Sequence, residues 1–160
     1  MAKEKEIKTN AMRILDRNKI AYQGHTYECT EFTDGGQIAD TLGLPHEIVY
    51  KTLVTTGKSK AHYVFVLPID AELDLKKAAH AAGEKSIEML PLKELTPLTG
   101  YVRGGCTALG MKKSFPVIAD QSILNHEKIY VSGGRLGSQL ELAPADYLRA
   151  ASAETADIVV

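Results

Sequence analysis

The sequence predicts a single α+β domain over residues 1–160, with a mixed, mostly antiparallel sheet or barrel-like core flanked by helices. The length is that of one domain, and strand-like segments alternate irregularly with helical ones. Two apolar segments on either side of a short polar turn, at 49–54 and 62–67, predict a hairpin. A doubly wound parallel sheet would instead place a helix between consecutive strands. The pattern therefore favours a mixed sheet.

The N-terminal third is predicted to hold two helices and a strand. Four apolar residues recur at the helical spacing i, i+4, i+7 and i+8: Ile7, Ala11, Ile14 and Leu15. This helix should end near Asn18, and a strand of mixed polarity should follow over 20–27. Turn-forming residues at 31–36 lead into a short helix over 37–42 that Gly43 closes. Pro45 is suited to open one further helical turn.

The central third is organised around a strand that contains Lys51. Side chains alternate along a strand, so Lys51 should share a face with Leu53. The polar turn at 57–60 pairs this strand with 62–67, which is apolar on both faces and should be central. Asp74 is a good N-cap for a helix through Ala82, ended by Gly83. Its inward residues should be Leu75, Ala78, Ala79 and Ala82.

The C-terminal half is predicted to contain shorter elements and two glycine-rich loops. The loops cover 99–110 and 132–137. The expected elements are strands at 86–90, 116–119, 129–131 and 140–142, helical turns at 91–95 and 120–124, and a helix over 144–151 that opens with Pro144.

Composition narrows the possible functions. A net charge of −1 gives no global attraction to nucleic acid, so any such contact needs local cations such as Lys112 and Lys113. Cys29 and Cys106 lie far apart, and the five histidines are scattered, so we expect neither a disulfide framework nor a metal site. The charged first residues and the lack of a long apolar run predict a soluble, cytoplasmic protein.

Three features carry possible chemistry. Lys51 is either a strand-end lysine that reaches water or a cation held in a pocket. Backbone N–H groups of the glycine-rich loops could bind an anion or a developing oxyanion, although such loops are also ordinary turns. A phosphate-binding loop is disfavoured at 105–112, because Met111 stands where that motif requires lysine. Cys106 has no histidine nearby in sequence, which favours a structural thiol.

Four segments in register resemble the YbaK family of aminoacyl-tRNA deacylases, over almost the whole chain. They are Tyr50-Lys51-Thr52-Leu53, Leu73-Asp74-Leu75-Lys76-Lys77, Gly100-Tyr101-Val102-Arg103-Gly104-Gly105 and Tyr130-Val131-Ser132-Gly133-Gly134. The family is similar to the editing domain of bacterial prolyl-tRNA synthetases. The resemblance implies hydrolysis of tRNA that carries a wrong, small amino acid, without metal or cofactor.

The resemblance also implies a set of site residues. Lys51 matches the family's essential lysine, and the substrate-binding positions are Tyr27, Phe32, Thr52, Gly104, Gly105, Ser132, Gly133 and Gln139. In the family, the thiol of a bound cysteine attacks its own ester, and the cysteinyl group leaves the tRNA as a thiolactone. The resemblance therefore implies that no protein nucleophile is needed.

The expected substrate is cysteinyl-tRNA(Pro), and possible additional activity on cysteinyl-tRNA(Cys) is left open. Prolyl-tRNA synthetase is the expected partner, because a synthetase pocket rejects a smaller amino acid weakly and a second site must hydrolyse the product. The chain departs from the family pattern at two places. It has Thr107-Ala108 where the family often has Ser-Pro, and Gln139 where the family often has aspartate. These departures leave alanyl-tRNA(Pro) as an alternative substrate. A non-catalytic module that binds tRNA or a synthetase is the alternative from another class.

Overall fold

The computed structural model describes residues 8–29 and 35–160. Within them the elements follow the order α1 (Asn10–Arg17), β1 (Gln23–Thr26), α2 (Gly35–Leu42), the 3-10 helix η1 (His46–Ile48), β2 (Tyr50–Gly57), β3 (His62–Pro68), α3 (Leu75–Ala82), β4 (Ile87–Met89), α4 (Leu92–Thr99), β5 (Val117–Asp120), the 3-10 helix η2 (Gln121–Asn125), β6 (Ile129–Ser132), β7 (Ser138–Leu142), α5 (Pro144–Ala151) and β8 (Ala153–Ala156). No helix in this part of the chain is long and apolar enough to cross a lipid bilayer.

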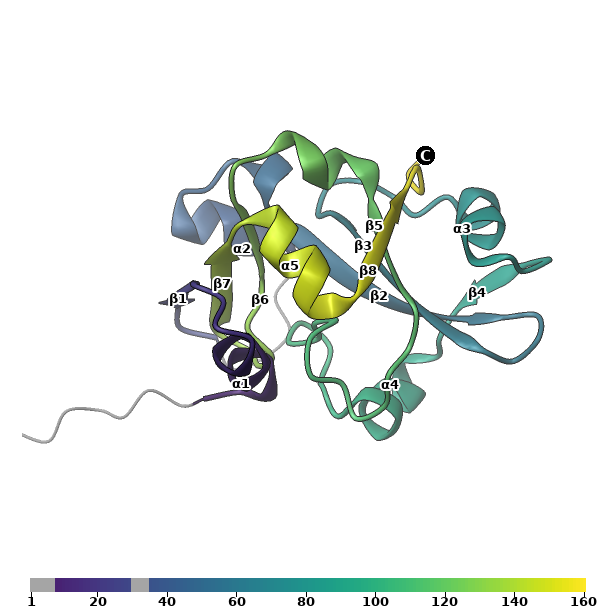
Figure 1. Ribbon diagram of the computed structural model, residues 1–160, viewed down its shortest axis with the longest axis horizontal. Coiled ribbons are helices and arrows are strands. Elements are labelled where there is room, and N and C mark those ends of the chain that lie inside the picture. The colour runs from purple at the N-terminus through teal and green to yellow at the C-terminus, as the bar shows by residue number, and fades with distance from the viewer. Residues whose placement is uncertain (1–7, 30–34) are drawn as a thin grey trace, which may run out of the picture.

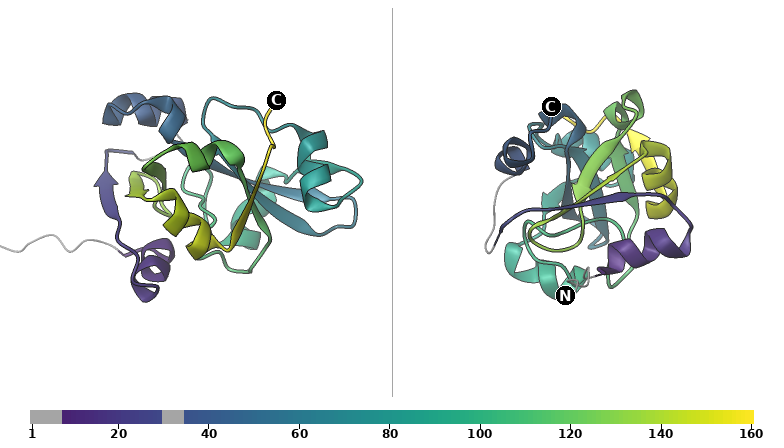
Figure 2. Two further views of the ribbon diagram at one scale, coloured as in Figure 1. Left: turned by 45° about the horizontal axis from the view of Figure 1, so that its top comes forward. Right: turned by 90° about the vertical axis from the view of Figure 1, so that its left-hand side faces the viewer.

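The strands form two sheets (Figures 1 and 2). The larger has the order β4-β2-β3-β5-β8, with antiparallel pairing of β2 to β3 and β4, and parallel pairing from β3 to β5 to β8. The smaller has the order β1-β7-β6 and is antiparallel throughout. A bridge between Val49 and Tyr130 joins the start of β2 to β6. The predicted mixed, mostly antiparallel α+β fold is confirmed.

Strand β3 is central because both of its faces are apolar. Val64 and Val66 belong to the main core cluster, which also contains residues of α1, β6, β7 and α5. Phe65 and Leu67 belong to a second cluster on the opposite face, with α3. All four side chains are fully buried. The strand that was expected to be central because it is apolar on both faces thus separates the two halves of the core.

Helix α3 is capped as predicted, but one of its residues is turned outward. Asp74 accepts hydrogen bonds from the N–H groups of Lys76 and Lys77 at 3.0 and 3.1 Å. The expectation that Leu75 faces inward is wrong, since this first helical residue is 43% exposed. Leu73, just before the cap, packs against the apolar cluster instead. The chain thus supplies the apolar contact before the helix begins.

Two further elements differ from the sequence-based expectation. Helix α4 continues through Pro97 to Thr99, beyond the predicted end at residue 95, because Leu95 and Leu98 pack against the main core. Strand β8 was not predicted at all. Its residues Ala-Glu-Thr-Ala have weak strand propensity, and its backbone pairing with β5 after the turn from α5 defines it.

Candidate active site

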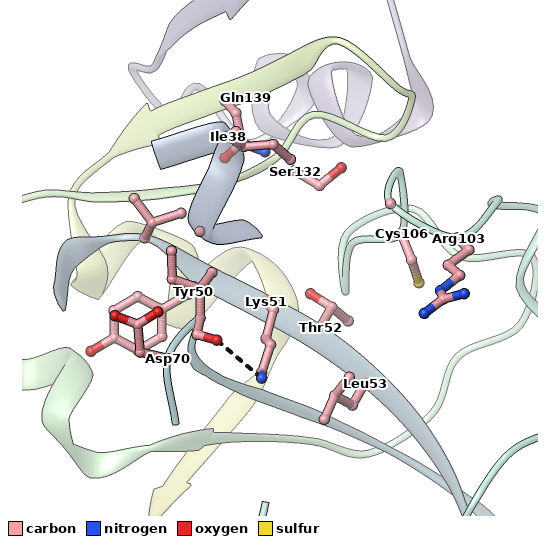
Figure 3. Close-up of a pocket in the computed structure, with 14 residues that line it drawn as sticks. Ile38, Tyr50, Lys51, Thr52, Leu53, Asp70, Arg103, Cys106, Ser132 and Gln139 are labelled. Atoms are coloured by element: carbon pink, nitrogen blue, oxygen red, sulfur yellow. Dashed lines mark hydrogen bonds between the residues drawn. The ribbon is translucent and has the colours of Figure 1, made fainter. Parts of the chain in front are cut away.

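A cavity of about 440 Å³ opens beside the first residues of β2 (Figure 3). Its wall is built from segments far apart in sequence: α2, the start of β2, the end of β3, the first glycine-rich loop, and strands β6 and β7. The lining residues are Gly36, Ile38, Val49, Tyr50, Lys51, Thr52, Leu53, Ile69, Asp70, Arg103, Gly104, Cys106, Ser132 and Gln139. The cavity therefore lies where the two sheets meet.

Lys51 is one of the lining residues and is half-buried. Its ammonium donates a hydrogen bond to the main-chain carbonyl of Ile69 over 3.2 Å. In Figure 3, Lys51 and Leu53 extend from the same side of β2, as the alternation of a strand requires. The lysine thus lies near the strand start and also faces the cavity.

Four of the other predicted substrate-binding residues line the same cavity: Thr52, Gly104, Ser132 and Gln139. Thr52 follows Lys51 on β2, and Gly104 comes from the first glycine-rich loop. Ser132 and Gln139 are opposite each other in the β6–β7 ladder, so one strand pair places both. The fold therefore gathers residues that the sequence separates widely.

Gln139 has a buried side-chain acceptor that lacks a partner among the residues the structure describes. Its side chain is 4% exposed, and its Oε1 atom has no hydrogen-bond partner within the described residues. A buried polar atom in this state costs stability unless a ligand or water satisfies it. Tyr27 approaches from the segment after β1, where its N–H bonds to the carbonyl of Gly137 at 3.0 Å. Burial raises the pKa of Tyr27, and the Gln139 side chain partly opposes this.

Tyr27, Gly105 and Gly133 lie next to the cavity and are not among the residues that line it. A Cβ atom at Gly105 would lie 2.9 Å from the backbone of Arg135, so glycine allows the two glycine-rich loops to touch. A Cβ atom at Gly133 would collide with the Ser138 side chain. Phe32, the remaining predicted position, lies outside the described residues.

Several loop amides already have partners inside the chain. The N–H groups of Gly105 and Gly133 donate to the carbonyls of Val102 and Ser138, each at 2.9 Å. The N–H of Gly134 donates to the Ser132 hydroxyl at 3.2 Å. These three groups are therefore not available to an anion. Positive charge at the cavity comes instead from the side chains of Lys51 and Arg103.

Sequence reasoning missed three polar lining residues. Cys106 lines the cavity, but burial raises the pKa of its thiol to about 12, so the thiol is protonated near neutral pH. Arg103 is the only cation of the first glycine-rich loop, and this feature of the sequence could have indicated a site residue. Asp70 lies in the loop after β3, and nothing in its local sequence marks it.

Asp70 also fixes one wall of the cavity through His46. The His46 Nδ1 atom lies 2.9 Å from Asp70 Oδ2, and its Nε2 atom lies 2.7 Å from Asp40 Oδ1 on α2. Hydrogen bonds with Asp40 and then Asp70 raise the pKa of His46. A protonated imidazole can donate to both carboxylates at once. This contact holds α2, which contributes Ile38 to the wall, against the loop after β3.

A cavity lined by a lysine cation, hydroxyl groups and a buried amide can bind a small polar molecule. No histidine is among the lining residues, so the Ser132 hydroxyl has no adjacent imidazole base there. In the part of the chain that the structure describes, no His, Cys, Asp and Glu cluster is arranged as metal ligands. A lysine cation and a buried acceptor at the same cavity can orient a carbonyl and a substrate ammonium.

Comparisons with known proteins give the family of the chain. A 160-residue alignment with "Putative Cys-tRNA(Pro)/Cys-tRNA(Cys) deacylase EbsC" of Enterococcus faecalis is 42% identical and covers 99% of this chain and 98% of that protein. The solved structure of "hypothetical protein APE2540" matches 95% of this chain and all of its own, with a TM-score of 0.86 and 23% identity. The solved structure of "a putative trans-editing enzyme for prolyl tRNA synthetase" matches 97% of this chain and 99% of its own, with a TM-score of 0.80 and 21% identity. Residues 33–150 match the family model of the aminoacyl-tRNA editing domain, so the chain belongs to that family.

Proposed function

We propose that this protein hydrolyses the ester of cysteinyl-tRNA(Pro), the mischarged product of prolyl-tRNA synthetase. One observation carries the proposal: Lys51, Thr52, Gly104, Ser132 and Gln139 line one cavity. The full-length similarity to EbsC supports cysteine as the amino acid.

Each end of the substrate has a matching group in the cavity. The Lys51 ammonium faces the carbonyl oxygen of the ester and stabilises the negative charge that develops there. The Gln139 Oε1 atom accepts a hydrogen bond from the α-ammonium of the aminoacyl group, which satisfies a buried oxygen that has no partner among the described residues. The aspartate that the family often has here would supply a full charge, so Gln139 holds the ammonium less strongly.

The nucleophile in this proposal is the thiol of the substrate. Its sulfur forms a bond with the ester carbon, the bond from that carbon to the ribose oxygen breaks, and the proton of the thiol ends on that oxygen. The released thiolactone then reacts with water to give free cysteine. A thiol of ordinary pKa, about 8.5, is partly ionised near neutral pH, whereas burial raises the pKa of Cys106 to about 12.

The test is deacylation of a panel of tRNAs by the purified protein at catalytic concentration. We expect rapid loss of cysteine from tRNA(Pro), with prolyl-tRNA(Pro) spared because proline has no thiol. Faster loss of alanine than of cysteine would replace this function by alanyl-tRNA(Pro) editing, for which Thr107 and Ala108 are the first residues to exchange. Binding of tRNA without hydrolysis of any ester would support the non-catalytic module.

A further inference from the structure

Basic side chains occur along the segment that runs from the end of β4 to β5, and one of them, Arg103, lines the cavity. Residues 89–119 contain four Lys or Arg residues and one acidic residue, in a chain whose net charge is −1. The four cations are Lys93, Arg103, Lys112 and Lys113, and all are exposed. We call them the basic rim. The rest of the chain is correspondingly acidic.

Local contacts hold the rim together. The N–H of Lys112 donates to the carbonyl of Thr99 at 2.9 Å, and its ammonium lies 3.4 Å from the carbonyl of Pro97. Residues 112–113 are therefore tied to the end of α4, while Lys93 lies in the first turn of that helix. The rim therefore combines a cation of α4 with cations from the segment that packs against the end of this helix.

Within the described residues, none of Lys93, Lys112 and Lys113 forms an ion pair with a carboxylate. Arg103 carries the same positive charge into the lining of the cavity. The segment that carries the basic rim therefore reaches the candidate active site at Arg103.

The opposite side of the cavity is acidic. Asp70 and Arg103 lie on opposite sides of Lys51 in Figure 3. Asp40, Glu47 and Glu72 are exposed near Asp70 on α2, η1 and the loop after β3, and His46 there is bonded to two carboxylates. A polyanion is attracted to one side of the opening and repelled from the other.

We propose that the basic rim binds the phosphodiester backbone of the RNA strand that leads to the esterified 3′ ribose. This inference rests on the proposed function, because it places the ester at Lys51 and the RNA beyond Arg103. Contacts with phosphate position a nucleic acid without reading its bases. The rim therefore contributes affinity for the end of any aminoacylated tRNA, and other contacts select which tRNA is bound.

The test compares two triple variants with the same loss of charge. The rim variant is Lys93→Gln/Lys112→Gln/Lys113→Gln. The control, Lys58→Gln/Lys76→Gln/Lys85→Gln, changes exposed lysines that do not line the cavity and that form no carboxylate ion pair within the described residues. We expect KM for cysteinyl-tRNA(Pro) to rise about tenfold or more in the rim variant at low salt, with kcat unchanged. The logarithmic salt slope should fall by about one for each lysine that contacts phosphate.

Two further probes show whether the rim variant has lost RNA binding or has a damaged cavity. A cysteinyl ester of adenosine has no phosphodiester, so both variants should hydrolyse it like the unchanged protein. A labelled single-stranded RNA without amino acid should bind more weakly to the rim variant in fluorescence anisotropy. Equal KM values for the two variants, or an RNA affinity that does not change, would overturn the inference. Loss of activity on the adenosine ester would overturn it too, because the rim would then shape the cavity.

The proposed function can fail separately. If the unchanged protein hydrolyses no ester, that function is wrong, while the anisotropy comparison still decides whether the rim binds RNA. A rim variant that loses only stimulation by prolyl-tRNA synthetase, with RNA affinity intact, would reassign the rim to an acidic protein surface and overturn the inference.

Discussion

The Lys51 ammonium donates to the main-chain carbonyl of Ile69 across 3.2 Å, which ties the start of β2 to the loop after β3. Ile69 in turn donates its N–H to the carbonyl of Val49 at 3.0 Å. The carbonyl that accepts from the lysine therefore belongs to a residue that is itself paired with the backbone just before β2. A cation held in this way needs little reorganisation when a charge develops beside it.

Replacement of Lys51 by alanine should remove that stabilisation. We expect kcat/KM for cysteinyl-tRNA(Pro) to fall about 100-fold or more, by analogy with the loss of one oxyanion donor, about 3 kcal/mol. Lys51→Arg should recover part of the rate, because charge remains while geometry changes. Lys58→Ala, in the turn of the same hairpin, is the matched control. Full activity of Lys51→Ala would exclude the role, and a covalent adduct trapped on Lys51 would replace it by nucleophilic catalysis.

Gln139→Leu should separate substrate binding from folding. The change removes the buried Oε1 atom that has no partner in the described residues, and a hydrogen bond to a charged group contributes about 1.5–3 kcal/mol. We therefore expect KM to rise at least tenfold, whereas Tm should stay within a few degrees of the original. The measurement is a KM and kcat pair together with a thermal melt. An unchanged KM would remove Gln139 from the ammonium site.

Cys106→Ala should remain active although Cys106 lines the cavity. Its thiol has a pKa of about 12, so almost none is ionised at neutral pH. The expected rate is within about threefold of the original, from altered packing alone. A folded Cys106→Ala protein without turnover would require a protein thiol in the mechanism. Alkylation of the intact protein at pH 7, read by mass spectrometry, should accordingly be slow at Cys106.

The contact of His46 with Asp40 and Asp70 predicts a stability that depends on pH. The pKa of His46 is raised in the folded state, so the folded protein binds the proton more tightly than the unfolded chain does. The stabilisation is complete below the unfolded pKa, about 6.5, and is lost as pH rises through the raised value. The Tm difference between the unchanged protein and His46→Gln should therefore shrink from pH 6 to pH 9. A difference that is constant or grows with pH would contradict this.

Local patterns predicted the elements that local forces specify. Turn, cap and alternation signals over a few residues predict three of these features: the hairpin of β2 and β3, the Asp74 cap and the start of α5 at Pro144. Strand β8 escaped prediction because only its parallel pairing with β5 makes it a strand. Pro97 is tolerated in α4 because packing of the flanking leucines outweighs a local preference for ending the helix.

The site was predictable to the extent that it depends on unusual local sequence. A lysine in an apolar strand and two glycine-rich loops drew attention to Lys51, Gly104 and Ser132, which line the cavity. Asp70 and Ile38 could not be found in that way, because the fold alone brings α2 and the end of β3 to the same wall. The roles of all these residues remain predictions.

The final prediction concerns the nucleophile and separates cysteine editing from alanine editing. Intramolecular attack by the substrate thiol needs a site that orients the sulfur and little else, because such attack has a high effective molarity. Serine has nearly the same volume, but its hydroxyl is not ionised near neutral pH and is a much weaker nucleophile. Seryl-tRNA(Pro) should therefore bind about as well as cysteinyl-tRNA(Pro) and react far more slowly, a loss in kcat with little change in affinity.

The measurement is single-turnover hydrolysis of cysteinyl-, seryl- and alanyl-tRNA on one tRNA body, with identification of the first product. A thiolactone from the cysteine ester, together with slow reaction of the other two, is the expected result. If water is the nucleophile, the rates for the three esters should instead depend mainly on how well each amino acid fits the cavity, because no group of the substrate takes part in the attack. Comparable rates for all three with free cysteine as the first product would exclude the thiol mechanism. Exchange of Gln139 for aspartate would then test whether the ammonium contact selects the amino acid, since a carboxylate there would bind all three substrates more tightly without restoring a preference for sulfur.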